Sequence, residues 1–79
     1  MSPTVFRSRG LRFYFFSREE RRIHVHVQAQ TGEAKFWLEP DIQLAENHGL
    51  TGRQLGLALR LVRERADEIS EAWQSHFGR

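Results

Sequence analysis

Polar and apolar residues alternate without interruption over residues 23–30, IHVHVQAQ. Successive side chains of a β-strand point to opposite faces, so this pattern predicts a strand with one buried and one exposed face. The apolar face would carry Ile23, Val25, Val27 and Ala29. The other face would carry His24, His26, Gln28 and Gln30.

Two neighbouring segments also have the composition of strands. Residues 11–16, LRFYFF, are rich in aromatic side chains, and residues 33–39, EAKFWLE, alternate again. Thr31 and Gly32 predict a two-residue turn before the later segment, since glycine tolerates the positive φ that such turns require. These three segments therefore predict consecutive antiparallel strands.

A fourth strand is expected after Pro40, which interrupts the third. Residues 41–46, DIQLAE, predict a short edge strand, and residues 47–49 predict a turn. The first ten residues read as a polar N-terminal arm, and residues 11–79 as a single small α+β domain.

The last third of the chain has the spacing of a helix. Apolar residues recur every three or four positions from Leu55 to Phe77, which predicts one helix of roughly six to seven turns. Thr51 is the expected N-cap, since its hydroxyl can accept from an amide of the first turn. Gly52 and Gly56 each cost about 1 kcal/mol relative to alanine, so fraying or a break is expected there.

These elements predict an α+β fold, a three- to four-stranded antiparallel meander covered on one face by a long C-terminal helix. One helix covers such a sheet incompletely, and Leu57 and Leu61 lie outside its main apolar stripe. We therefore expect the chain to dock on a second copy of itself, as a homodimer, or on another protein.

Composition narrows the function classes. The 79 residues include no cysteine, which excludes disulfides and thiolate metal sites. No segment approaches the ~20 apolar residues of a membrane span, and residues 1–10 lack the apolar core of a signal peptide. We expect a cytoplasmic protein without a membrane segment and without a cofactor.

Charge is distributed unevenly along the chain. Lysine and arginine total 12 against 10 acidic residues, and eleven of the twelve cations are arginine. Six arginines lie in the first 22 residues, where the only acids are Glu19 and Glu20. The arginine fork suits phosphate and carboxylate, so this bias favours nucleic acid or an acidic partner, although a GC-rich genome would produce the same bias.

The turn at Thr31 and Gly32 would also fix which side chains lie together. The expected opposite pairs are Gln30–Glu33, Gln28–Lys35, His26–Trp37 and His24–Glu39. If the strand at 11–16 buries its leucine and two of its phenylalanines, its alternate residues join the face that carries the histidines. This face, called the histidine face below, would hold Arg12, Tyr14, Phe16, His24, His26, Gln28, Lys35, Trp37 and Glu39.

The histidine face supports two readings. Aromatic rings can stack on bases at about 1–3 kcal/mol each while cations meet phosphate, which makes a nucleic-acid platform. Alternatively, the rings are cross-strand packers or are covered by a partner protein. The residues assigned to nucleic-acid binding are Arg12, Lys35, Trp37, Arg21 and Arg22.

The histidine pair itself has three interpretations. His24 and His26, with Tyr14, are candidate catalytic residues for metal-independent cleavage of RNA, because one imidazole can take a proton while another gives one. As metal ligands they need Glu39 as a third, so no metal site is predicted. The third interpretation is polar surface histidines with an aromatic neighbour. His48 and His76 are interpreted as incidental.

Several motifs together resemble a known family. They are Gly10 to Tyr14, the pair His24 and His26, Gly32 to Phe36, and Ala58 to Ala66 followed by Trp73. In this order they resemble the bacterial domain-of-unknown-function family 4160. The chain departs from that pattern at Arg21 and Arg22, where relatives usually carry two prolines.

The resemblance implies a genetic context and no catalytic mechanism. Members are often encoded beside a small protein of another uncharacterised family, numbered 2442, in what looks like a toxin–antitoxin pair, with this member as the suspected toxin. It carries over no catalytic residue. The leading hypothesis is a toxin-type component that binds or cleaves RNA through the histidine face, and the alternative is a non-enzymatic protein–protein interaction module.

Overall fold

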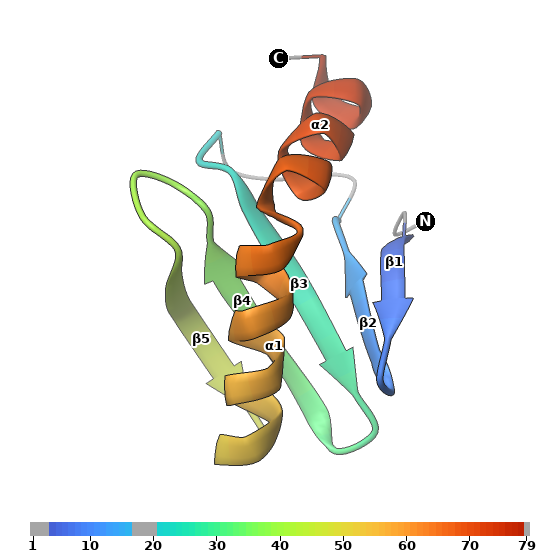
Figure 1. Ribbon diagram of the computed structural model, residues 1–79, viewed down its shortest axis with the longest axis vertical. Coiled ribbons are helices and arrows are strands. Elements are labelled where there is room, and N and C mark those ends of the chain that lie inside the picture. Colours follow the sequence, from blue (N-terminus) through green and yellow to red (C-terminus); the bar gives the residue numbers. More distant parts are fainter. Residues whose placement is uncertain (1–3, 17–20, 79) are drawn as a thin grey trace.

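The sheet of this protein is a simple antiparallel meander. The computed structural model describes residues 4–16 and 21–78, and within them five strands lie side by side in chain order (Figure 1). The strands are β1 (Thr4–Ser8), β2 (Leu11–Tyr14), β3 (His24–Ala29), β4 (Gly32–Trp37) and β5 (Gln43–His48). The helices are α1 (Gly52–Glu64) and α2 (Ala66–Phe77).

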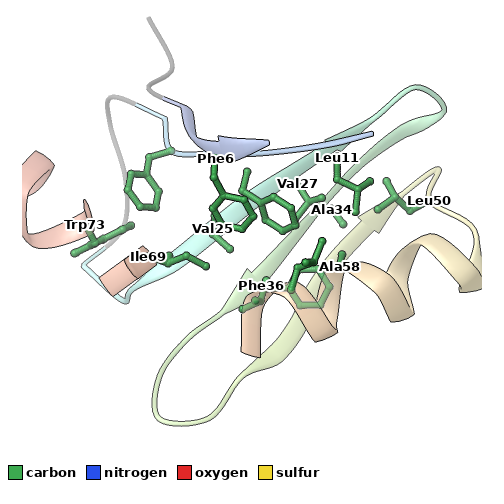
Figure 2. Packing of buried hydrophobic residues seen from close by; sticks show 14 residues of the cluster. Phe6, Leu11, Val25, Val27, Ala34, Phe36, Leu50, Ala58, Ile69 and Trp73 are labelled. Atoms are coloured by element: carbon green, nitrogen blue, oxygen red, sulfur yellow. The ribbon is translucent and has the colours of Figure 1, made fainter. Parts of the chain in front are cut away.

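The helices lie on one side of the sheet, where α1 crosses β3 and β4 and α2 continues past the end of the sheet (Figure 1). Between the two layers lies a single cluster of buried apolar side chains (Figure 2). Val25 and Val27 of the central strand are fully buried there, beside Phe13 and Phe36 from its two neighbours. Burial of each such side chain contributes about 1.5–3 kcal/mol to the stability of the fold. The buried valines are those that the alternation placed on the apolar face, so the predicted faces of β3 are confirmed.

The expected number of strands was too small, because β1 lies within the segment interpreted as a polar arm. Phe6 is the one residue of β1 that is buried, and its ring stacks on Phe13 with 4.3 Å between centroids. A register shift between Thr4 and Phe6 breaks the alternation of β1. One buried side chain and a bulge leave almost no periodic signal in the sequence.

The expected hairpin register was wrong by two residues. The loop is Gln30 and Thr31, so Ala29 lies opposite Gly32, His24 opposite Trp37 and His26 opposite Lys35. Gly32 therefore lies in β4 and not in the loop. The position requires glycine because β5 approaches it closely, and a Cβ there would collide with the His48 carbonyl oxygen. A shift of two residues leaves the paired side chains on their predicted face, so the histidine face keeps its predicted members within β2, β3 and β4.

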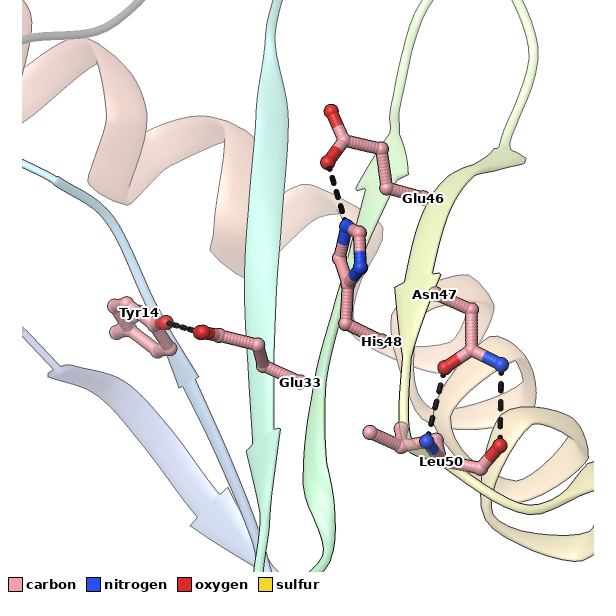
Figure 3. Close-up of polar contacts among 6 residues, drawn as sticks. All are labelled: Tyr14, Glu33, Glu46, Asn47, His48 and Leu50. Carbon is pink, nitrogen blue, oxygen red and sulfur yellow. Dashed lines mark hydrogen bonds and ion pairs between the residues drawn. The ribbon is translucent and has the colours of Figure 1, made fainter.

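The edge strand lies two residues later in the chain than predicted. β5 extends to His48, so Asn47 and His48 lie in the strand and not in a turn. The reversal follows at Gly49, whose φ of +105° suits glycine. The Asn47 side chain fixes this corner, because its Oδ1 accepts from the Leu50 amide (3.0 Å) and its Nδ2 donates to the Leu50 carbonyl oxygen (3.1 Å; Figure 3).

The helix begins as predicted but does not continue unbroken. Thr51 caps α1, and with Gln54 it forms a capping box in which each side chain meets the other residue's amide (3.1 and 2.9 Å). The expected break at Gly52 or Gly56 is wrong: the axis changes at Arg65, whose φ and ψ are −116° and 25°. The cap stabilises the glycine-containing first turns, and after the break α2 packs Trp73 against Phe15 and His24 at the end of the sheet.

Leu61 was also misplaced by the sequence reasoning. It is buried, because Ala58, Leu61 and Val62 form an i, i+3, i+4 set on the side of α1 that faces the sheet. Leu57 is partly buried against the same cluster. The apolar face of α1 is therefore wider than the apolar stripe that was predicted for one continuous helix from Leu55 to Phe77.

The two glycines Gly32 and Gly56 make a matched test of the packing. We expect Gly32→Ala to destabilise the fold by about 1–3 kcal/mol, because the added methyl group has no space between β4 and β5. Gly56→Ala should stabilise it by up to about 1 kcal/mol, since its Cβ enters open space in a helix. Urea unfolding of both variants measures this, and equal effects would contradict the register described above.

Candidate functional site

The histidine face is the side of the sheet opposite α1. In the register observed, Arg12 lies opposite Gln28 and Tyr14 opposite His26, while Lys35 follows on the other side of His26. Cross-strand partners point to the same side of a sheet, so β5 adds Glu46 beside Lys35 and His48 beside Glu33. The face therefore brings together the predicted residues of β2, β3 and β4 with two residues of β5.

His24 is buried, with 1% of its surface exposed. Its Nδ1–H donates to the Arg22 carbonyl oxygen at 2.7 Å, since a carbonyl can only accept. The ring lies edge-on between Trp37 (5.4 Å) and Trp73 of α2 (5.1 Å). His24 therefore packs the end of the sheet against α2, and its burial argues against proton transfer to a bound phosphodiester.

His26 is half-buried at the centre of the face. Its ring stacks on Tyr14 (5.3 Å between centroids) and contacts Phe16 (4.3 Å). Burial, together with electrostatic repulsion from His24 and Lys35, lowers the pKa of His26 from 6.5 to about 4, while Glu46 acts in the opposite direction. At neutral pH His26 is an uncharged ring that can stack or accept a hydrogen bond.

Tyr14, the third catalytic candidate, is also buried, with 4% of its surface exposed. Its hydroxyl donates to Glu33 Oε2 at 3.5 Å (Figure 3), and its ring contacts both His26 and Phe16. Tyr14 thus supports the rings around it, and its hydroxyl is directed along the sheet toward β4.

The predicted cations on this face are held by aromatic rings. The Arg12 guanidinium lies 4.5 Å from the Tyr14 ring centroid, and its Nε and Nη1 donate to Thr4 Oγ1 (2.7 Å) and Gln28 Oε1 (3.2 Å). Such cation–π contacts contribute about 0.5–1 kcal/mol each at exposed sites. Arg12 is therefore oriented by three groups before any ligand arrives.

Trp37 orients two more cations. The Arg22 guanidinium lies 4.1 Å from its ring and Lys35 Nζ 4.4 Å, while Arg22 Nε donates to the Glu39 carbonyl oxygen at 2.7 Å. These contacts make Trp37 a support for charge rather than a bare surface for a base. Arg21 lies next to Arg22 and is exposed. Among the phenylalanine, tyrosine and tryptophan rings of the face, Phe16 is the most exposed, at 42%.

Two residues of the face were missed by the sequence reasoning, Glu46 and His48. They border a hollow of about 340 Å³ that Phe16, His26, Glu33 and Lys35 also line. His48 Nε2 lies 3.2 Å from Glu46 Oε1 (Figure 3). His48 was interpreted as incidental because a turn was expected at 47–49. The alternation Glu46, His48 repeats that of His24, His26 and would have placed both residues on this face.

Glu39 does not join the histidines as expected. Under the predicted pairing it would have faced His24, but Trp37 occupies that position, and Glu39 Oε2 accepts from the Ile23 amide at 3.5 Å. Within residues 4–16 and 21–78, no three histidine or acidic side chains gather as a metal-binding group.

The sequence comparison places this arrangement in a family. A family model described as a domain of unknown function, DUF4160, matches residues 10–74, from the turn before β2 to the last turn of α2. The chain belongs to this family. The DUF4160 match contains every strand of the histidine face except β1.

No curated protein and no solved structure matches the chain. Neither helix in the part of the chain that the structure describes is long and apolar enough to cross a membrane. The residues of the histidine face are therefore the basis for assigning a function.

The lowered pKa of His26 predicts a pH dependence of stability. The unfolded chain binds a proton at His26 below pH 6.5 and the folded chain only near pH 4, so the free energy of unfolding falls as pH drops through this window. We expect His26→Gln to flatten this fall, measured by urea unfolding at pH 7 and pH 4.5. His48→Gln, a substitution at an exposed ring, is the control. Identical pH profiles for His26→Gln and the wild type would contradict the assignment.

Proposed function

We propose that this protein is the toxin-type component of a bacterial toxin–antitoxin pair, acts in the cytoplasm, and binds RNA across the histidine face. The observation that carries the proposal is the set of three cations fixed over aromatic rings: Arg12 over Tyr14, and Arg22 and Lys35 over Trp37. Cations held in place lose less side-chain entropy on meeting phosphate than free ones do.

The hollow beside these cations supplies the stacking surface. Phe16 is the exposed ring, and uncharged His26 lies against it at 4.3 Å. A base that stacks on Phe16 gains about 1–3 kcal/mol, and its amino group could donate to the ring nitrogen of His26. Lys35 lines the same hollow, so a phosphate of the same nucleotide would meet a cation there.

The geometry supports binding better than cleavage by the predicted histidine pair. Acid–base cleavage needs two accessible groups, one to accept and one to give a proton. His24 is 1% exposed and Tyr14 4%, and neutral His26 has no extra proton to give at pH 7. In this proposal the three candidate catalytic residues form and support a binding surface.

The toxin-type role rests on membership of DUF4160 and on the gene arrangement that the resemblance implies. The cognate partner would be a small protein of the family numbered 2442. A toxin that binds RNA needs a surface that the partner can mask, and an open sheet face of this kind offers one.

A second candidate function is a non-enzymatic interaction module. Phe16 is a large apolar residue of the histidine face that remains 42% exposed, and Glu33 and Glu46 mix negative charge into the same face. Such a surface suits a protein partner or a second copy of this chain. Salt dependence separates the two functions, because phosphate contacts release counterions.

Binding of a single-stranded RNA should weaken steeply as the salt concentration rises. Two variants should separate the electrostatic contribution to affinity from the stacking contribution. We expect Lys35→Gln to reduce the slope of log affinity against log salt by about 0.7. Phe16→Ala should leave the slope unchanged and cost about 5- to 150-fold in affinity. Fluorescence anisotropy at several salt concentrations measures both. Leu44→Ala, on the helix side of β5, is the control, and salt-insensitive or absent binding by the wild type would remove the RNA proposal.

Induced expression in a bacterial host tests the toxin-type role. We expect growth arrest by the wild type, relief by the double variant Phe16→Ala and Lys35→Gln, and rescue by co-expression of a family-2442 partner. Leu44→Ala should arrest growth as the wild type does. Arrest that persists in the folded double variant would place the activity elsewhere on the surface.

A further inference from the structure

A second and larger hollow lies at the tip of the β1–β2 hairpin, where Figure 1 shows the β3–β4 hairpin ending at the same end of the sheet. Its volume is about 680 Å³, and Arg7, Arg9 and Arg12 line it together with Gln28 and Gln30. None of the described residues that line it is acidic. This region, called the arginine hollow below, thus differs from the mixed charge around His26.

The placement of Arg7 works against stability. Arg7 lies directly opposite Arg12 on adjacent antiparallel strands, so both guanidinium groups leave the same face of the sheet. Like charges in directly opposed positions destabilise a strand pair. A β-branched residue at position 7 would favour the strand pairing. Stability therefore does not explain the arginine at this position.

The backbone at Arg9 also works against stability. Arg9 has φ +52° and Gly10 φ +79°, and together they form the two-residue loop between Ser8 and Leu11. Two positive φ values define the type I′ turn, in which asparagine followed by glycine is preferred. Arginine at the first position carries strain that asparagine would largely avoid. Both costs fall on arginines of the same hollow.

Arg12 connects this hollow to the histidine face. Its guanidinium is held by Thr4, Gln28 and the Tyr14 ring, and Tyr14 in turn stacks on His26. A strand of RNA that runs from the arginine hollow past Arg12 and along β2 would reach Tyr14, whose ring contacts both His26 and Phe16. Phosphates at the hairpin tip and a base on Phe16 therefore fit one continuous ligand.

We propose that the arginine hollow is a phosphate-binding site for the RNA backbone, formed by Arg7, Arg9 and Arg12. The inference rests on the proposed function of the histidine face and extends it, because it sets where the strand enters the sheet. Guanidinium groups bind phosphate through paired N–H donors, and Gln28 and Gln30 add neutral donors at the same place.

The test uses substitutions that should weaken RNA binding without weakening the fold. We expect Arg9→Asn and Arg7→Thr each to lower affinity for single-stranded RNA about fivefold at 0.1 M salt, because affinity varies as salt concentration to the power of about −0.7 per phosphate neutralised. The double variant should lose about 25-fold and reduce the salt slope by about 1.4. The unfolding midpoint in urea should stay the same or rise.

The matched control is the double variant Arg53→Gln and Arg63→Gln. It removes an equal number of positive charges, from exposed positions on α1. Its RNA affinity should stay within about twofold of the wild type, since it leaves the sheet face unchanged. An equal loss in this control would show a general charge effect and would overturn the site.

The remaining outcomes separate the two proposals. Wild-type binding that both arginine variants retain would overturn the arginine hollow and leave the histidine face standing. Absence of binding by the wild type would overturn both. Competition by polyglutamate as effective as that by RNA of equal charge would assign the hollow to an acidic protein and would also overturn the inference.

Discussion

Burial of Val25 and Val27 in the central strand is the constraint on which the rest of the molecule depends. Both side chains are completely buried between the sheet and the helices, and alternation then sends His24 and His26 to the other side. The neighbours follow the same rule, because Phe13 and Phe36 must pack beside the valines. The aromatic and cationic residues of the histidine face are thus placed by the core, and a one-residue slip would exchange the two sets.

The same alternation gives His24 and His26 different environments. His26 keeps an accessible edge over the hollow, whereas His24 lies against Trp73 and Trp37 with its Nδ1–H bonded to a carbonyl oxygen. The difference arises from α2, which turns at Arg65 and extends past the end of the sheet. A sequence pattern gives the face on which a residue lies, but the depth of burial depends on what other elements reach it.

This distinction explains how much the sequence could predict. The strands at 11–16, 23–30 and 33–39, the cap at Thr51 and the membership of the histidine face follow from strong periodicity or from local chemistry. The pairing at Gly32, the strand β1 and the break at Arg65 depend on long-range contacts that leave little local pattern. His48 was missed because the predicted edge strand ended at Glu46, two residues too early, and Glu46 was missed because that strand was not assigned to the face, although their alternation was visible.

The two hollows of the sheet differ in what holds their charges. Around His26 the cations lie on rings and beside Glu33 and Glu46, so the local charges offset one another and the fold gains from the contacts. In the arginine hollow Arg7 and Arg9 occupy positions that cost stability, one through an opposed like charge and one through a positive φ. Natural chains retain such costs where a function requires them. A polyanion offsets both costs, since it neutralises the opposed guanidinium groups and gains a third cation at the turn. The arginine hollow thus combines two positions that cost stability with the cations that the proposed phosphate backbone would meet.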